Sequence, residues 1–400
     1  MIHRDVTARI KQMIPSWPVV CIMGPRQAGK TTFARDCFPA YTYYLCDFKE
    51  LRLQIEKDPH QFLATAFASA PGIIIDEFQR CPDLLDAIKI YVDETKSQGQ
   101  IVLTGSQNYL MMSNITQSLA GRVMLVDFLP LAINELQQAQ LLPQNIYDLI
   151  YKGSFPRIYS DPTATVYLTY ENYIRTYIER DVQTLPNPPD LYQFDKFLRL
   201  CAGRIGQQLN MQALAADAGI DFKTANQWVS LLISCYVVYL LPPHFANFNK
   251  TVTKHAKLYF SDTGIACWLL NIKSPEDLAQ HPMRGALFEN FVITECKKWH
   301  YARTSSSRDM YFSRDNQGNE VDLIFDQGMT KMTPVEIKAA GEAKRSMTEG
   351  LAVWRELAGD VAKESFVIYT GTEMQSIADV QFFPWQHIPD LLSKLYPAQQ

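Results

Sequence analysis

The first 135 residues are predicted to form an α/β domain in which helices cover both faces of a mainly parallel sheet. Short apolar runs typical of buried strands alternate with stretches of helical periodicity, and such alternation produces parallel sheets. A glycine-containing loop after the first run and two acidic residues after the third fit the same architecture. The expected strands span residues 18–23, 42–47, 72–76, 100–104 and 123–127.

The loop after the first strand carries a phosphate-binding pattern. It reads Gly24-Pro25-Arg26-Gln27-Ala28-Gly29-Lys30-Thr31-Thr32 and matches G-x-x-x-x-G-K-[ST]. In such a loop, backbone amides converge on phosphate oxygens at the positive end of the following helix. Lys30 is expected to reach the β- and γ-phosphates, and Thr31 is expected to bind Mg²⁺. The residues predicted to contact the nucleotide are Gly24, Gln27, Ala28, Gly29, Lys30, Thr31 and Thr32.

Two carboxylates end the third expected strand, which reads Gly72-Ile73-Ile74-Ile75-Asp76-Glu77. A strand buried on both faces delivers its last residues to the carboxyl edge of the sheet, where nucleotides bind in this architecture. Asp76 is therefore expected to hold the Mg²⁺ shell, and Glu77 to orient or deprotonate the attacking water. The predicted cofactors are ATP and Mg²⁺.

Two further residues complete the predicted catalytic set. The fourth strand ends in small polar groups, and Ser106 is the candidate for sensing the γ-phosphate or positioning water. Arg122 closes the segment Ser118-Leu119-Ala120-Gly121-Arg122 and is a candidate arginine finger, in the same subunit or in a neighbouring one. The second role requires an oligomer. A plain surface or salt-bridged arginine is the alternative interpretation.

The composition is that of a globular protein with several domains. The 400 residues are 47% hydrophobic, which is enough for cores in about two to four domains. The net charge of -4 gives no global basic signature, so any nucleic-acid contact must use a local patch. The eight cysteines form no C-x-x-C pair, which favours reduced thiols in the cytoplasm. The longest apolar run, residues 228–241, is too short to span a membrane.

A helical region and a linker are predicted to follow the first domain. An aromatic stripe at helical spacing indicates a core face and consists of Tyr167, Tyr170, Ile174 and Tyr177. The clearest linker is Pro186-Asn187-Pro188-Pro189-Asp190. The predicted divisions are a core over residues 1–135, a helical lid or linker over 136–190, a module over 191–260 and a final domain over 261–400.

The module over residues 191–260 contains a predicted helix-turn-helix. A helix from Met211 ends at a turn at Gly219, and a second helix is capped by Asp221. Strand candidates follow at 237–240 and 257–260, which is the order of a winged helix. Residues in position to meet a DNA groove are Lys223, Thr224, Asn226 and Gln227. Because only one of them is basic, a packing module or protein-binding lid is the alternative.

The last segment holds a second set of chemical groups. Asp322 lies on an expected strand over 319–325, and Glu336 and Lys338 share one face of the next strand. Glu289 lies beside the apolar face of the preceding expected helix. Phosphodiester cleavage needs carboxylate ligands for Mg²⁺ and a cation that activates water. These four residues are therefore a candidate metal-dependent nuclease site, and a salt-bridge cluster in a binding module is the alternative.

The order of these motifs resembles the prokaryotic AAA-type ATPases, and more narrowly those that carry a C-terminal domain of unknown function. The resemblance covers nearly the whole chain and implies a P-loop ATPase core, a winged helix and a PD-(D/E)xK restriction-endonuclease-like domain. The sensor strand departs from it, because Ser106 is not an asparagine. The segments that carry the resemblance are 24–32, 75–79, 103–107, 118–122, 153–157, 177–181, 259–264, 320–322 and 336–338.

Two functions are consistent with these features. In the first, the chain hydrolyses Mg·ATP and couples this to DNA binding or processing by its C-terminal region. In the second, ATP controls association with a partner protein, and the nuclease-like domain is a catalytically inactive docking surface. Stimulation of ATP hydrolysis by DNA would favour the first function.

Overall fold

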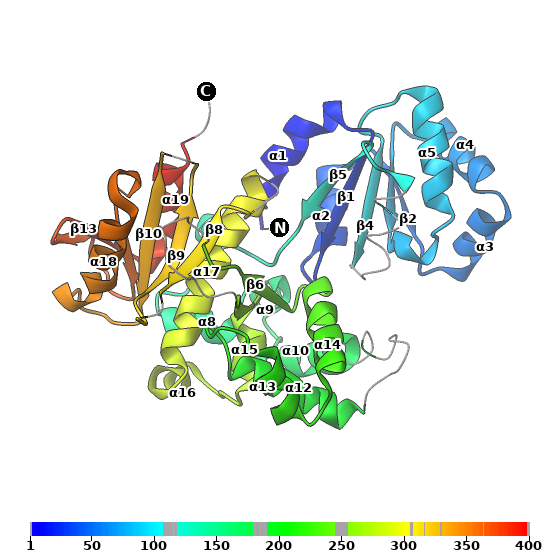
Figure 1. Cartoon of the computed structure of the whole chain (residues 1–400). Coiled ribbons are helices and arrows are strands. Elements are labelled where there is room, and N and C mark those ends of the chain that lie inside the picture. The colour runs from blue at the N-terminus through cyan, green and yellow to red at the C-terminus, as the bar shows by residue number, and fades with distance from the viewer. Residues whose placement is uncertain are drawn as a thin grey trace. The chain divides into compact units, whose positions relative to one another are not determined.

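The computed structural model describes residues 2–106, 115, 118–178, 182, 190–244, 255–304, 307–315, 317–328, 330–362 and 364–397. Figure 1 shows the chain from its N-terminus to its C-terminus. Contacts between residues divide it into two compact units. Unit 1 comprises Met1–Leu131, Ile233–Tyr236 and Tyr301–Ser305, and unit 2 comprises Ala132–Leu232, Val237–His300 and Ser306–Gln400.

Unit 1 is built on a five-stranded parallel sheet (Figure 1). The strand order is β2-β3-β4-β1-β5, and every neighbouring pair is parallel. The strands are β1 (Val19–Gly24), β2 (Thr42–Leu45), β3 (Ile73–Asp76), β4 (Ile101–Ser106) and β5 (Val123–Asp127). The parallel sheet predicted from five apolar runs is confirmed, because each strand overlaps its predicted range.

Helices cover both faces of this sheet because side chains alternate along each strand. Val20 and Ile22 of β1 pack in one core with residues of α1 and α2. Cys21 and Met23 of the same strand face a second core with residues of α3, α4 and α5. The helices are α1 (Val6–Met13), α2 (Lys30–Cys37), α3 (Lys49–Lys57), α4 (Pro59–Ser69) and α5 (Leu84–Thr95). Because all neighbouring strands are parallel, the carboxyl ends of all five strands lie at one edge of the sheet.

The first part of unit 2 is helical. Its helices are α7 (Ile133–Gln138), α8 (Ile146–Lys152), α9 (Pro156–Ser160), α10 (Val166–Tyr173), α12 (Leu191–Ala202), α13 (Met211–Ala218) and α14 (Phe222–Ser234, whose last two residues count with unit 1). As predicted, α13 ends at Gly219, which has a φ of +74°, and the Asp221 carboxylate accepts a hydrogen bond from the Thr224 amide at 3.0 Å. Strands β6 (Val238–Leu241) and β7 (Lys257–Phe260) follow as an antiparallel pair. That this arrangement is a winged helix stays a prediction.

The predicted aromatic stripe is wrong at its first residue. Tyr170 and Ile174 are buried, but Tyr167 is 48% exposed, and Tyr173 is buried instead. Tyr167 lies in the first turn of α10, and a π-helical segment, Ile174–Ile178, interrupts the spacing further along. The Tyr177 side chain, residues 179–181 and the linker residues 186–189 lie outside the described part of the chain.

The second part of unit 2 contains a six-stranded mixed sheet of order β12-β13-β11-β10-β9-β8. Its strands are β8 (Met310–Arg314), β9 (Glu320–Asp326), β10 (Met332–Lys338), β11 (Phe366–Tyr369), β12 (Gln375–Ile377) and β13 (Val380–Pro384). The helices are α15 (Thr263–Leu269), α16 (Pro275–Gln280), α17 (Arg284–Arg303), α18 (Glu349–Ala358) and α19 (Ile388–Leu395). Leu351 and Trp354 of α18 pack with Ile324 on one face, and His300 of α17 contacts Phe325 on the other.

Two sequence expectations concern membranes and cysteines. Among the described residues, we find no helix with the length and apolar character needed to cross a bilayer. The structure describes all eight cysteines, and no disulfide joins any of them.

Candidate functional site

The loop between β1 and α2 takes a conformation that needs both of its glycines. A Cβ atom on Gly24 would lie 2.0 Å from the carbonyl oxygen of Phe128, and Gly29 has a φ of +90°. Between them, Gln27 also has a positive φ, and Ala28 is buried. Thr32 lies exposed in the first turn of α2. The loop therefore presents backbone amides at the positive end of α2, where an anion is stabilised.

Lys30 is buried at the start of α2, with its ammonium group against the loop. Its Nζ donates to the carbonyl oxygens of Gly24 at 2.9 Å and Pro25 at 2.7 Å. Burial lowers the pKa of Lys30 to about 8, although the nearby carboxylates of Glu77 and Asp76 oppose the shift. The charge is poorly solvated, so a phosphate group would gain a strong, charge-assisted contact with it.

Asp76 is buried at the carboxyl end of β3 and is fixed by four donors. It accepts hydrogen bonds from the hydroxyls of Thr31 at 2.6 Å and Tyr43 at 2.7 Å, from the Glu77 amide at 3.1 Å, and from the Thr104 hydroxyl. Strand β4 lies between β1 and β3, which brings Thr104 level with Asp76. Thr31 and Asp76 are thus in direct contact, and their oxygens are the ligands that Mg²⁺ takes beside phosphate.

Glu77 follows Asp76 in a backbone conformation that is uncommon for a residue with a side chain. Its φ is +54°, in the left-handed region. The Gln79 side-chain amide donates a hydrogen bond to the Glu77 carboxylate. Strained backbone of this kind concentrates at functional sites. The predicted catalytic glutamate therefore lies at the carboxyl edge of the sheet, next to the predicted metal ligand.

The fourth-strand prediction is resolved only in part. Ser106 ends β4 beside Gly24, but its side chain lies outside the described part of the structure. Thr104 lies two residues earlier on the same face of β4, and it contacts Asp76. Since Thr104 also belongs to the run of small polar groups, its alternation with Ser106 was the sequence signal.

Arg122 does not join the nucleotide site of its own chain. Val123 pairs with Val19, so Arg122 lies at the amino end of β1, whereas the loop follows the carboxyl end. The length of β1 separates the two, about 20 Å at roughly 3.3 Å per residue. Its guanidinium instead pairs with Asp93, with Nε–Oδ1 at 2.6 Å and Nη2–Oδ2 at 2.8 Å. A same-subunit arginine finger is therefore wrong, and a role in a neighbouring subunit stays a prediction.

Arg4 braces the loop and was not singled out by any sequence motif. Its guanidinium donates to the carbonyl oxygens of Ala28 at 3.1 Å and Leu129 at 2.5 Å, and it lies 4.0 Å from the centre of the Phe128 ring. Arg4 is only 9% exposed. Because its partners are backbone carbonyls remote in sequence, no local pattern could have predicted the contact.

We expect Arg4→Ala to weaken ATP binding by about tenfold. The variant loses two charged hydrogen bonds, each worth about 1.5–3 kcal/mol, so Ala28 and the loop are no longer held in the conformation that binds phosphate. Arg4→Lys should recover only part of the affinity, since one ammonium group cannot reproduce the planar fork. The matched control is Arg9→Ala, which removes a hydrogen bond to the Tyr301 carbonyl from the neighbouring helix. ATP affinity by calorimetry and thermal unfolding should be measured on each variant. A lower melting temperature with unchanged ATP affinity would show that Arg4 only supports the core.

The residues of the predicted nuclease-like site come together in unit 2. Lys338 Nζ lies 2.6 Å from Glu336, which is on the same strand β10. It lies 3.6 Å from Asp322, which is on the antiparallel neighbouring strand β9. The Asp322 carboxylate also accepts a hydrogen bond from the Ile337 amide at 2.8 Å. Burial and the neighbouring Asp322 carboxylate raise the pKa of Glu336 to about 9. Period-two geometry therefore places these groups as predicted.

Glu289 joins this cluster through Lys257, which the sequence patterns did not identify. Lys257 lies on β7, and its Nζ is 3.0 Å from Glu289 and 2.5 Å from Glu320. The Tyr259 hydroxyl, on the same face of β7, donates to Glu289 at 2.5 Å. Burial and the Asp322 charge raise the pKa of Glu289 to about 7. A lysine within the short apolar strand Lys257–Phe260 was the available signal.

Metal binding by this cluster stays a prediction. Within the described residues, no three His, Cys, Asp or Glu side chains are arranged so that they could hold a metal ion. The carboxylates are instead bridged by lysines. The structure thus unites Glu289, Asp322, Glu336 and Lys338 as an ion-paired cluster.

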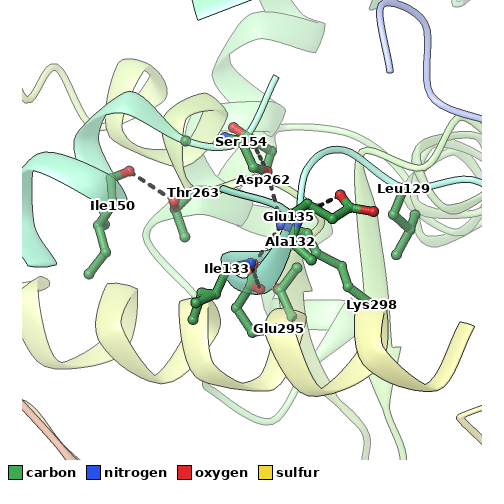
Figure 2. A network of polar contacts seen from close by, with 12 residues as sticks. Leu129, Ala132, Ile133, Glu135, Ile150, Ser154, Asp262, Thr263, Glu295 and Lys298 are labelled. Atoms are coloured by element: carbon green, nitrogen blue, oxygen red, sulfur yellow. Dashed lines mark hydrogen bonds and ion pairs between the residues drawn. The ribbon is translucent and has the colours of Figure 1, made fainter. Parts of the chain in front are cut away.

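Two motifs of the family resemblance meet in a separate buried network (Figure 2). The Asp262 carboxylate accepts hydrogen bonds from the Ser154 amide and hydroxyl, both at 2.7 Å, and from the Tyr170 hydroxyl at 2.7 Å. It also accepts from the amides of Gly264 at 2.9 Å and Ile265 at 3.3 Å. A Cβ atom on Gly264 would lie 2.2 Å from the Tyr170 ring, which explains the glycine.

The network continues to the start of α7. Lys298 Nζ donates to the Ser154 hydroxyl at 3.0 Å and to Glu295 at 2.7 Å, and Glu295 accepts a hydrogen bond from the Ile133 amide at 2.7 Å (Figure 2). Buried polar groups of this kind are costly unless they are satisfied. The motifs around Ser154 and Asp262 therefore fix α7, α15 and α17 to one another.

The predicted DNA-facing residues divide into two pairs. Lys223 and Gln227 are exposed on α14. The Thr224 hydroxyl is bound to Asp221 at 2.6 Å, and the Asn226 side chain donates to the Phe222 carbonyl at 2.8 Å. Of these four residues, only Lys223 and Gln227 have no side-chain hydrogen bond to their own helix in the described structure.

Three stretches of the chain match known protein families. Residues 16–137 match the family described as AAA domain, and residues 143–276 and 284–388 match two domains of unknown function, DUF8612 and DUF4143. Two relatives are the "Uncharacterized protein Mb2031c" of Mycobacterium bovis and the "Uncharacterized protein Rv2008c" of Mycobacterium tuberculosis. Each is 28% identical over 324 residues, which is 80% of this chain and 70% of the relative.

Similar solved structures are more distant. A signal transduction ATPase with numerous domains, PH0952 from Pyrococcus horikoshii, is 13% identical with a TM-score of 0.30, and the match covers 77% of this chain and 48% of that one, about half its length. The McrB AAA+ hexamer with bound McrC from Thermococcus gammatolerans is 9% identical with a TM-score of 0.23, covering 68% of this chain and 80% of that one. These scores are too low to show a shared fold. The AAA-domain match over residues 16–137 supports a P-loop ATPase that binds ATP in unit 1.

Proposed function

We propose that unit 1 binds and hydrolyses ATP together with Mg²⁺. The observation that carries this proposal is the 2.6 Å contact between Thr31 and Asp76, beside the buried ammonium group of Lys30. The loop amides and Lys30 would bind the phosphates, and Thr31 and Asp76 would hold the ion. Bound Mg²⁺ would neutralise negative charge on the phosphate oxygens.

In this proposal Glu77 acts on the attacking water. The water oxygen bonds to the γ-phosphorus, the bond to the β–γ bridging oxygen breaks, and the Glu77 carboxylate takes up the proton released by the water. Ser106 is the proposed γ-phosphate sensor. Arg122 of a second copy is the proposed arginine finger, because the Arg122 of the same chain lies at the other end of the sheet.

We further propose that ATP hydrolysis drives DNA binding or processing by unit 2, with Lys223 and Gln227 of α14 facing the groove. A second candidate is a switch in which ATP controls the binding of a protein. Large exposed apolar side chains on the same helical unit favour this candidate, because such groups bind protein surfaces rather than phosphates. They are Leu191, Tyr192 and Phe222.

One set of assays tests both steps. ATP hydrolysis should be measured with and without duplex DNA on the intact chain and on Glu77→Gln. We expect Glu77→Gln to lower kcat by about 10²–10⁴-fold at nearly unchanged ATP affinity, because the variant keeps the phosphate contacts but loses the base. The control Glu94→Gln changes an exposed glutamate on α5 and should retain full activity. Stimulation of ATP hydrolysis by DNA would support an ATPase coupled to DNA binding or processing, and its absence would favour the protein-binding switch.

A further inference from the structure

The carboxylate–lysine cluster of unit 2 contains one lysine more than the nuclease-like pattern requires. We define the cluster as the four carboxylates and two ammonium groups of Lys257, Glu289, Glu320, Asp322, Glu336 and Lys338. Lys338 already supplies the lysine of the D…E-x-K pattern, and its side chain is 38% exposed. The side chain of Lys257 is 1% exposed and comes from a separate strand, β7. Lys257 therefore needs its own explanation.

Lys257 bridges carboxylates from two different elements. Its Nζ lies 3.0 Å from Glu289 on α17 and 2.5 Å from Glu320 at the start of β9. The Phe312 ring, with its centre 5.3 Å from Nζ, adds a cation–π contact. The ammonium group thus occupies the space between carboxylates in which a cation is stabilised.

Protein donors share the carboxylate oxygens that face the lysines. The Tyr259 hydroxyl donates to Oε1 of Glu289, the same oxygen that contacts Lys257. Oδ2 of Asp322 accepts a hydrogen bond from the Ile337 amide and lies 3.6 Å from Nζ of Lys338. A divalent ion that took these two oxygens as ligands, at about 2.1 Å, would have to displace those donors. It would also lie close to a buried ammonium group and be repelled by it.

We propose that Lys257 is the built-in cation of this cluster and that it keeps divalent metal ions out. Displacing the Lys257 ammonium group from Glu289 and Glu320 would leave buried charge without its partner. This is far more costly than losing an exposed ion pair. Unit 2 would then bind a ligand without cutting a phosphodiester bond. This inference rests on the proposed binding role of unit 2 and narrows that role from processing to binding without cleavage, but it does not depend on ATP hydrolysis.

The test is a titration of the full chain with Mn²⁺ in the absence of nucleotide, followed by electron paramagnetic resonance and calorimetry. An Asp76→Asn background removes the predicted metal ligand of unit 1. With Lys257 in place, we expect no Mn²⁺ binding at millimolar concentration. In Lys257→Met, we expect one new site with a dissociation constant at least tenfold below the millimolar range. The matched control is Arg314→Met, which removes an equal charge that contacts Glu320 from the exposed side at 3.1 Å. It should bind no Mn²⁺.

Two results would overturn the proposal. The first is Mn²⁺ binding with Lys257 in place that is lost in Asp322→Asn. The second is a folded Lys257→Met that binds Mn²⁺ no better than Arg314→Met. Should Lys257→Met fail to fold, Lys257→Gln retains a hydrogen-bond donor without the charge, and the titration with Lys257 in place remains decisive. Failure of the ATPase proposal would show as a chain that does not hydrolyse ATP, which leaves this titration unaffected.

Discussion

Replacing Lys30 by methionine should reduce ATP affinity by about thirtyfold or more while leaving unit 1 at least as stable as before. The affinity falls because truncating one partner of a buried charge pair costs about 2–5 kcal/mol. The stability result follows from burial, which lowers the pKa of Lys30 from 10.5 to about 8. That shift disfavours the charged form in the folded state by roughly 3 kcal/mol. Two hydrogen bonds, to Gly24 and Pro25, are lost in exchange.

The pH dependence of unfolding provides the check on this explanation. Between pH 8 and 10.5 the unfolded chain holds the Lys30 proton and the folded chain releases it, so folded-state stability rises with pH. Lys30→Met should lack this rise, and its advantage should therefore be largest below pH 8. Lys49→Met, at an exposed position on α3, is the control and should change neither ATP affinity nor stability. If Lys30→Met retained ATP affinity, phosphate binding by this loop would be excluded.

Replacing Asp262 by alanine should destabilise unit 2 by about 3–5 kcal/mol, the range seen when one partner of a buried charged network is removed. The change would leave the buried amides of Ser154 and Gly264 without their acceptor, whereas the Tyr170 hydroxyl would keep its hydrogen bond to the Lys152 carbonyl. Each unsatisfied donor costs about 1–3 kcal/mol. Urea unfolding of the full chain, followed by tryptophan fluorescence, measures the loss.

The controls separate the network from ordinary ion pairs. Asp262→Asn keeps one acceptor oxygen and should lose less stability than Asp262→Ala. Asp148→Ala removes a partly exposed pair with Lys152 one turn away, which is worth about 0.5 kcal/mol or less. ATP affinity should stay the same in all three variants. Equal stability of Asp262→Ala and Asp148→Ala would show that the network does not hold this unit together.

Much of unit 1 could be predicted because its signals are local. The strand before Gly24 and the strand that ends at Asp76 are short apolar runs, and parallel pairing brings their carboxyl ends to one edge. The contact of Thr31 with Asp76 follows from that edge. The pairing of Asp322 with Lys338 follows in the same way from period-two alternation on adjacent strands.

The remaining features depend on contacts that sequence patterns do not encode. Arg4 reaches backbone carbonyls, which every residue offers, and Lys257 reaches its carboxylates across two elements. The same-subunit role of Arg122 overlooked a signal that was present: Arg122 directly precedes the predicted strand 123–127, which in a parallel sheet places it at the amino edge, away from the loop after β1. Tyr167 followed helical spacing but lies in a first turn, beyond the packed part of the helix.

Strand β7 and the residues just after it contribute to both buried clusters of unit 2. Lys257 and Tyr259 hold Glu289, and Asp262 holds Ser154. Any fragment that starts or stops near residue 260 would divide these partners and expose lone charges in each half. The helical segment and the C-terminal sheet should therefore be expressed and unfold together. A chain divided between them would give two insoluble pieces.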